Sequence, residues 1–176
     1  AASLRPKTDN DEYINSELPV FLMNYIKKKR VNVRLIHLSS INTLKNELKD
    51  NYTLSKKKAE QKLTEKNVTI IRLPLIIKIN KEKVIENCGQ ISIFFKYLKI
   101  PILFYPMIFP GNIYTPLDIK KLLNFTNEII EGKKNNKIYN LLGKDKVNTF
   151  EIFKKIATNQ NKKVIKINFG MFMKFL

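Results

Sequence analysis

Hydrophobic residues in the first half of the chain recur at spacings that alternate between helical and strand-like. Apolar positions three or four apart predict a helix over 11–29, which Pro19 either kinks or begins. A β-branched and apolar run predicts a buried strand over 33–40. A lysine-rich amphipathic pattern then predicts a helix over 52–66, and a second β-branched run predicts a strand over 68–77. Strand, helix and strand in this order form a βαβ unit, which implies a parallel sheet and an α/β fold.

The pattern in the second half of the chain is less regular. Prolines among aromatic and aliphatic residues predict a mixture of loop and strand over 100–114. Periodicity or a capping residue predicts three further helices. These cover 89–98, 117–131 up to Gly132, and the residues after an N-cap at Thr149. Short strands are expected over 137–142 and 163–167.

Composition limits the function mainly by exclusion. The 176 residues are 44% hydrophobic, enough for an ordinary folded core, and no run of about 18 apolar residues predicts a membrane span. Cys88 is the only cysteine and His37 the only histidine, so we expect no disulfide within the chain and no metal site. This cysteine usage fits a reducing cytoplasm, and the first residues lack the apolar core of a signal peptide.

The net charge of +18 is large, but it is spread evenly along the chain. Lysines occur in almost every segment, and the densest basic runs, 27–30 and 56–58, are short. We interpret most of this charge as solvated surface, with a basic groove for an anionic substrate as the second interpretation. A nucleic-acid-binding domain would rest on charge alone, because the sequence shows no aromatic and basic platform.

The candidate chemistry lies around the predicted βαβ unit. Ser39 and Ser40 end the first strand, and ligands of open α/β sheets bind at the carboxyl ends of the strands. Tyr52 and Lys56 follow on the next helix, and their spacing puts them on one helical face. A phenol has a pKa of about 10, but a nearby ammonium favours the phenolate and lowers that pKa. Tyr52 could then exchange a proton with a substrate hydroxyl, while Ser40 holds the reacting oxygen.

Each half of this pattern also has an ordinary structural explanation. A Tyr-x-x-x-Lys spacing occurs by chance in lysine-rich sequences, and paired serines often cap turns. Their joint occurrence, in order and at a strand end, favours the catalytic interpretation.

A longer stretch of sequence resembles one protein family. Three successive segments resemble the central part of extended short-chain dehydrogenases/reductases. They are the strand ending in Ser-Ser (35–40), the helix Tyr-Thr-Leu-Ser-Lys-Lys-Lys-Ala-Glu (52–60) and the strand Val-Thr-Ile-Ile-Arg-Leu-Pro (68–74). The resemblance is to the NAD-dependent epimerase/dehydratase type. Segments 113–119 and 137–152 are similar to later parts of the same family.

This resemblance implies a fold and a division of the chain. The fold would be α/β, a partial Rossmann-like parallel sheet with a small C-terminal α/β part that caps the substrate. Residues 1–78 would be the C-terminal part of a cofactor-binding domain. Residues 79–176 would be mostly the substrate-capping region, with some segments returning to the core sheet.

The resemblance also implies roles for individual residues. Tyr52 would be the general acid/base, Lys56 would bind the nicotinamide ribose and tune Tyr52, and Ser40 would hold the substrate oxygen. Asn15 would steady the catalytic elements and approach the cofactor. The cofactor would be NAD or NADP, and five residues would line its cleft mostly through their backbones. These are Ala1, Ala2, Leu38, Leu73 and Pro74.

The chain departs from the family in two places. The glycine-rich turn that cradles the pyrophosphate is absent, so we expect a fragment that lacks the N-terminal segment and is inactive alone. The connection between Ser40 and Tyr52 is shorter than in typical sugar epimerases. It is more similar to the atypical branch related to an accessory subunit of respiratory complex I. Arg72 has an ordinary strand-end interpretation and receives no role.

The function that the resemblance implies is that of an NAD(P)-dependent epimerase, dehydratase or reductase acting on a nucleotide-activated sugar or another small hydroxy or keto substrate. The alternative is a non-catalytic NAD(P)-binding or assembly subunit. The expected location is cytoplasmic, with no nucleic-acid partner. Many relatives build a four-helix dimer from the helices that correspond to 11–29 and 52–66, so the resemblance allows for a homodimer.

Overall fold

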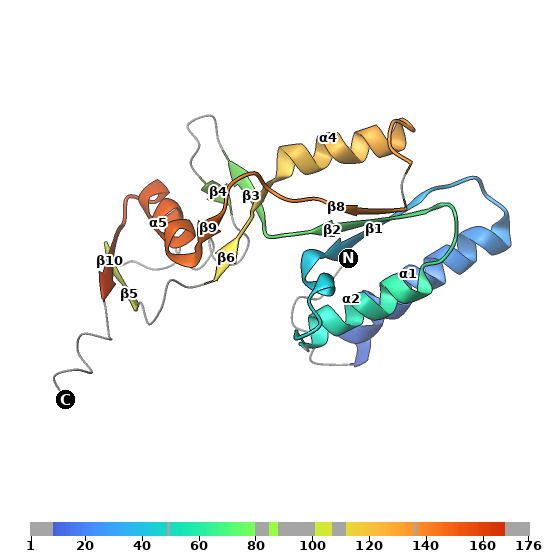
Figure 1. The fold of residues 1–176 in the computed structure, drawn as a ribbon, viewed down its shortest axis with the longest axis horizontal. Coiled ribbons are helices and arrows are strands. Elements are labelled where there is room, and N and C mark those ends of the chain that lie inside the picture. Colours follow the sequence, from blue (N-terminus) through green and yellow to red (C-terminus); the bar gives the residue numbers. More distant parts are fainter. Residues whose placement is uncertain are drawn as a thin grey trace. The chain divides into compact units, whose positions relative to one another are not determined.

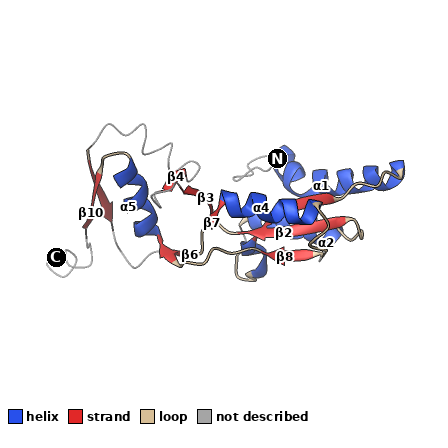
Figure 2. Ribbon diagram, turned by 90° about the horizontal axis from the view of Figure 1, so that it is seen from above, coloured by secondary structure: helices blue, strands red, loops and turns tan. Residues whose placement is uncertain are grey.

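The computed structural model describes residues 9–48, 50–79, 85–87, 101–106, 112–135 and 137–167 (Figures 1 and 2). The chain forms two compact units. The first extends to Pro74 and includes Phe125–Leu141, and the second comprises Leu75–Asn124 and the chain from Leu142 onward. The predicted α/β class with parallel strands is confirmed. The predicted helix over 89–98, together with Cys88, lies outside the described residues.

A parallel three-stranded sheet forms the base of the first unit. Its strands are β1 (Leu35–Ser40), β2 (Val68–Leu73) and β8 (Ile138–Asn140), in the order β1-β2-β8. The register pairs Ser40 with Leu73, so β1 and β2 end level with each other. The predicted βαβ unit is therefore confirmed.

Helices cover both faces of this sheet. Helices α1 (Asp9–Lys29) and α2 (Asn51–Lys62) lie side by side on one face (Figure 1). The C-terminal half of α4 (Ile119–Ile130) lies on the other face (Figures 1 and 2). A short 3-10 helix, η1 (Ile41–Leu44), follows β1 directly. The buried cluster on the α1 and α2 side consists of Met23, Leu63, Val68 and Ile70.

The apolar stripe that predicts α1 is not its buried face. The helix continues through Pro19 without a break. Phe21 and Tyr25 are about half exposed, at 55% and 51%, and their rings stack with centroids 6.4 Å apart. Asn15 and Ser16 are instead fully buried. A polar interior thus forms part of the contact that α1 makes with the rest of the unit.

Helix α2 begins at a side-chain cap and ends earlier than predicted. The Asp50 carboxylate accepts a hydrogen bond from the backbone N–H of Thr53 at 2.9 Å, which satisfies one of the free N–H groups of the first turn. The helix ends at Lys62, and Leu63 then turns into the core with 1% of its surface exposed. The predicted strand over 68–77 divides at Pro74 into β2 and β3 (Ile76–Ile79).

In the described part of the second unit, the strands form three small sheets. Strand β3 lies between β4 (Ile85–Asn87) and β7 (Leu117–Asp118). Strands β5 (Ile102–Pro106) and β10 (Lys163–Ile167) are parallel, whereas β6 (Ile113–Tyr114) and β9 (Val147–Asn148) are antiparallel. Helix α5 (Thr149–Asn159) supplies Ile152, Ile156 and Ala157 to a core that also contains Ile77.

The N-cap of α5 differs by one residue from the prediction of Thr149. The Asn148 side chain accepts from the Glu151 N–H at 2.8 Å, and the Glu151 carboxylate accepts from the Asn148 N–H at 3.0 Å. This reciprocal capping box satisfies two donors at once, which a single hydroxyl does not. The Thr149 hydroxyl donates instead to the Asn112 carbonyl at 3.2 Å. The predicted end of α4 at Gly132 is confirmed by a φ of 76°.

Replacing Gly143 by alanine should destabilise the protein. A Cβ at this position would lie 1.9 Å from the Pro116 carbonyl oxygen, so the backbone would have to move. We expect a loss of about 1–3 kcal/mol in the free energy of unfolding, measured with urea. Gly132→Asn is the control, because the space beside Gly132 is open and asparagine tolerates a positive φ. A Gly143→Ala variant as stable as the wild type would contradict the close contact.

Candidate functional site

The candidate site is the edge of the first unit where β1 and β2 end. Ser40 and Leu73 are paired at this edge, and η1 begins immediately after Ser40. The polypeptide then enters α2 at Asn51, so Tyr52 lies in the first turn of that helix. The strand end and the helix start that carry the predicted residues therefore belong to one βαβ crossover.

Ser40 is buried, and its hydroxyl shapes the turn after β1. The exposed fraction of Ser40 is 8%, and its Oγ accepts a hydrogen bond from the Asn42 N–H at 3.2 Å. The Thr43 hydroxyl donates to the Ser40 carbonyl at 2.8 Å. Because Oγ acts as an acceptor in the first bond, it retains its own proton for donation.

Tyr52 and Lys56 lie on one face of α2, as predicted. The Lys56 ammonium is 5.9 Å from the centroid of the Tyr52 ring. Lys56 is 3% exposed, and its Nζ donates to the Leu38 carbonyl at 3.1 Å. Tyr52 is half-buried. A lysine buried to this extent is unusual, and here it joins α2 to β1.

The pKa of Tyr52 departs from the sequence-based expectation. Burial, and secondarily the negative charge of Asp50, raise the pKa of the Tyr52 phenol above its usual value. The expected lowering by Lys56 is therefore wrong for this structure. Burial lowers the pKa of the Lys56 ammonium, and the negative charge of Glu60 opposes that effect. The phenol is accordingly protonated at neutral pH.

Glu60 forms a polar cluster that the sequence interpretation missed. Its carboxylate accepts hydrogen bonds from the Ser39 hydroxyl at 2.5 Å, from the Thr43 hydroxyl at 3.1 Å and from Arg72. Arg72 Nη2 lies 2.6 Å from Glu60 Oε2, and Arg72 Nε lies 3.0 Å from the same oxygen. Two signals in the sequence could have indicated it. Glu60 is one helical turn after Lys56, and Arg72 is an arginine inside a β-branched strand.

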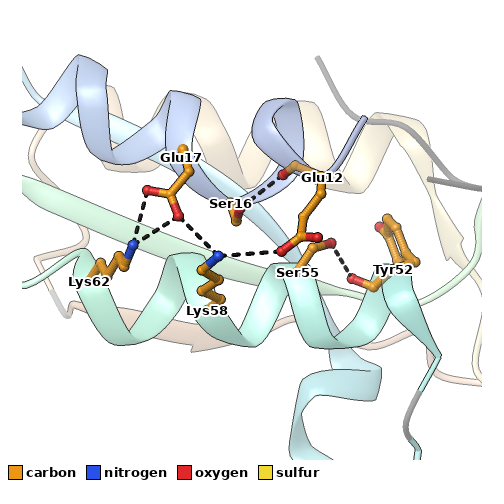
Figure 3. A network of polar contacts seen from close by, with 7 residues as sticks. All are labelled: Glu12, Ser16, Glu17, Tyr52, Ser55, Lys58 and Lys62. Carbon is orange, nitrogen blue, oxygen red and sulfur yellow. Dashed lines mark hydrogen bonds and ion pairs between the residues drawn. The ribbon is translucent and has the colours of Figure 1, made fainter. Parts of the chain in front are cut away.

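A second set of polar contacts lies between α1 and α2 (Figure 3). Lys58 is 3.3 Å from both Glu12 and Glu17, and Lys62 is 2.8 Å from Glu17. Tyr52 is at the N-terminal end of the same stretch of α2 (Figure 3). These ion pairs are about half exposed, so solvent screens them and each one is weak. They join the two helices without entering the candidate site.

The predicted cofactor-lining residues occupy different environments. The Leu38 side chain is 46% exposed, and its carbonyl accepts from Lys56. Leu73 is buried at the end of β2, and Pro74 after it is half-buried. Asn15 is fully buried in α1, so its side chain lies in the interior of the unit. The remaining two predicted residues, Ala1 and Ala2, lie outside the described residues.

His37 is a buried titratable residue of β1, two positions before Ser39. It is 7% exposed on β1, and its Nε2 has no hydrogen-bond partner in the described part of the molecule. Burial, with the positive charge of Lys56 adding to it and Glu60 opposing it, lowers the pKa of His37 to about 4. The imidazole is therefore neutral at physiological pH.

Among the described residues, no cluster of histidine, cysteine or acidic side chains could hold a metal ion. In the same part of the chain, no helix is both long enough and apolar enough to cross a bilayer.

Solved structures share this fold. No protein-family model matches the sequence, and no curated protein matches it either. The chain is similar to a dTDP-4-dehydrorhamnose reductase from Bacillus anthracis solved in complex with NADP, with a TM-score of 0.71 at 16% identity over 96% of this chain. It is also similar to a UDP-N-acetylglucosamine 4-epimerase from Bacillus cereus, with a TM-score of 0.71 at 16% identity and 96% coverage. A hypothetical dTDP-4-dehydrorhamnose reductase from Sulfolobus tokodaii gives a TM-score of 0.66 at 22% identity and 96% coverage.

These likenesses establish the fold of the chain. The resemblance to extended short-chain dehydrogenases/reductases is therefore confirmed at the level of the fold. The chain spans 64% of the Bacillus anthracis reductase, 64% of the Bacillus cereus epimerase and 63% of the Sulfolobus tokodaii protein. It thus corresponds to less than two thirds of each of these proteins.

Acid should destabilise the protein through His37. In the unfolded chain the imidazole takes up a proton near its ordinary pKa of 6.5, whereas in the folded chain it does so only at about 4. The neutral, buried imidazole therefore stabilises the folded chain relative to the unfolded one. This stabilisation is fully present above pH 6.5 and is lost as the pH falls toward 4. The difference corresponds to about 3 kcal/mol.

Urea unfolding of the wild type and of His37→Gln across this pH range measures the effect. The glutamine side chain does not titrate, so the variant should lose less stability on acidification than the wild type. The effect of carboxylate protonation on stability is the same in both proteins, so it cancels in the comparison. Identical pH dependence of the two proteins would show that His37 is not buried as described.

Proposed function

We propose that the protein is an NAD(P)-dependent oxidoreductase of the extended short-chain dehydrogenase/reductase family that acts on a nucleotide-activated sugar. The observation that carries this proposal is the position of Ser40, Tyr52 and Lys56 around one βαβ crossover, at the carboxyl edge of a parallel sheet. The similar solved structures include reductases and epimerases of nucleotide sugars, one of them in complex with NADP. Because the chain spans under two thirds of those structures, the activity is proposed for the native polypeptide.

The residues present fit the ribose end of a nicotinamide dinucleotide. An ammonium has three N–H donors, and Lys56 uses one of them on the Leu38 carbonyl. The other donors can bind ribose hydroxyls at the edge where β1 and β2 end. The backbones of Leu73, which ends β2, and of Pro74 after it would line the same edge. A bound nicotinamide dinucleotide supplies hydride transfer, and the protein supplies binding and orientation.

The protonated form of Tyr52 is the form that the reduction of a ketone requires. In the reduction of a ketone, the carbonyl oxygen must receive a proton as hydride reaches the carbon. A phenol is protonated at neutral pH, and burial and Asp50 raise the pKa of Tyr52 further, so it can donate that proton. The Ser40 hydroxyl would donate a hydrogen bond to the same oxygen and stabilise its developing negative charge. Lys56 would hold the ribose beside Tyr52 through its remaining N–H donors.

A non-catalytic NAD(P)-binding or assembly subunit is the second candidate. The short connection between Ser40 and Tyr52 favours it, since η1 and a few following residues replace a longer substrate loop. The raised pKa of Tyr52 also disfavours its use as a base. Both candidate functions predict cofactor binding, but only the first predicts turnover of a substrate.

Replacing Tyr52 by phenylalanine should strongly lower turnover and preserve the fold. Assays would use the native polypeptide with NADH or NADPH and a panel of dTDP- and UDP-linked 4-keto sugars. We expect kcat to fall by about 100-fold or more, because the proton donor is lost. Tyr25→Phe is the matched control, since Tyr25 is exposed on α1. Equal turnover by Tyr52→Phe and the wild type would remove Tyr52 from the mechanism, and cofactor binding without any turnover would favour the second candidate.

Replacing Lys56 by methionine should weaken the binding of the cofactor. Loss of charged hydrogen bonds to the ribose should raise the Kd for NADH or NADPH by about 10- to 100-fold, measured by the quenching or enhancement of nicotinamide fluorescence. Lys66→Met removes an exposed lysine just after α2 and is the control for net charge. The same Kd in both variants would mean that Lys56 only joins α2 to β1.

A further inference from the structure

Glu60 lies where three structural elements meet. It projects from α2 and binds Ser39 at the end of β1, Thr43 in η1 and Arg72 near the end of β2. The Glu60 and Arg72 side chains are 8% and 17% exposed, so solvent screens their ion pair little. One carboxylate thus joins the helix that carries Tyr52 and Lys56 to both strand ends of the candidate site.

The contacts of Glu60 lie on both sides of Ser40. Ser39 precedes Ser40 and donates its hydroxyl to Glu60. Thr43 lies three residues after Ser40, and its single hydroxyl proton faces two acceptors, the Ser40 carbonyl at 2.8 Å and Glu60 at 3.1 Å. Any displacement of Glu60 therefore alters the turn in which the Ser40 hydroxyl accepts from Asn42.

Glu60 also continues the functional face of α2. Positions 52, 56 and 60 are successive turns on one side of the helix. Burial disfavours the charged form of Glu60, but hydrogen bonds from Arg72 and Ser39 outweigh it and hold the pKa of the carboxyl below its usual range. An ionised Glu60 is in turn the carboxylate that opposes the lowering of the Lys56 pKa by burial.

We propose that Glu60 is a positioning residue, whose carboxylate sets the spacing and register between the Ser40 turn and the face of α2 that carries Tyr52 and Lys56. Arg72 fixes the orientation of that carboxylate through its planar, two-pronged contact. The inference rests on the proposed function of Ser40, Tyr52 and Lys56. It assigns roles to Glu60 and Arg72, which have none in the proposed function.

Two variants separate the shape of Glu60 from its charge. Glu60→Gln keeps the length of the side chain and loses the charge, whereas Glu60→Asp keeps the charge and loses the reach. Glu65→Gln is the control, because Glu65 forms an ion pair with Lys27, which is 67% exposed. The amide of Asn42 reports on the Ser40 turn, and the amide of Ile70 in β2, which donates to Lys137, reports on the sheet.

Hydrogen exchange followed by NMR on the full chain tests the positioning role without requiring turnover. We expect both Glu60 variants to speed exchange at Asn42 by about 10-fold or more relative to Ile70. Glu60→Gln should also lower the pKa of Lys56, read from its Cε resonance, and Glu60→Asp should restore most of that pKa. Equal acceleration at Asn42 and Ile70, with an unchanged Lys56 titration, would reduce Glu60 to a general stabilising residue and overturn the proposal.

Kinetics of the native polypeptide add a second, independent readout. We expect Glu60→Gln to lower kcat by about 10- to 100-fold with little change in KM, because the acid and the hydroxyl are misplaced rather than removed. A large loss in Tyr52→Phe combined with wild-type kcat in Glu60→Gln would overturn the positioning role alone. Unchanged kcat in Tyr52→Phe would overturn the proposed function, and the exchange experiment would still decide the role of Glu60.

Discussion

The parallel pairing of β1 with β2 is the constraint on which the rest of the first unit depends. Parallel neighbours require a crossover, and here α2 forms it. The chain must therefore leave β1 at Ser40, return along α2 from its first turn, and enter β2 at the opposite edge. This geometry brings the end of the strand and the start of the helix to one edge. The candidate chemistry at Ser40, Tyr52 and Lys56 follows from that topology.

Buried hydrogen bonds then determine how precisely α2 is positioned relative to β1 and β2. Lys56 binds a carbonyl of β1, and Glu60 binds residues at the ends of both strands. Such contacts are directional, and leaving one partner unpaired in a buried place costs about 1–3 kcal/mol or more. An apolar contact would tolerate sliding of α2 along the sheet, whereas these hydrogen bonds specify one register. The buried polar residues that fix the position of α2 on the sheet are thus residues in or beside the candidate site.

Much of the first unit could be predicted from sequence, because its strands and α2 have clear periodicity and obey local rules. The errors arose where tertiary contacts override local patterns. The apolar stripe at Phe21 and Tyr25 predicts α1 correctly but does not identify its buried face, which contains Asn15. The cap of α5 moved to Asn148 because a reciprocal capping box is better than one hydroxyl.

The candidate site was predictable in its residues but not in its electrostatics. The order Ser40, Tyr52, Lys56 and its place at a strand end could be read from spacing alone. The pKa of Tyr52 could not, because it depends on burial and on Asp50, which caps the helix only in the folded chain. The Glu60 cluster was also missed, since Ser39, Thr43 and Arg72 are brought together only by the crossover.

The most direct test of the central claim is a titration of NADPH or NADH into the isotope-labelled native polypeptide, followed by amide chemical shifts. We expect the largest changes to cluster at the carboxyl edge, over 40–43, 51–56 and Leu73. Saturable shifts confined to that edge would place the dinucleotide where the topology requires it. Shifts scattered over the lysine-rich surface, or no saturable shifts at all, would contradict a dinucleotide site at this edge.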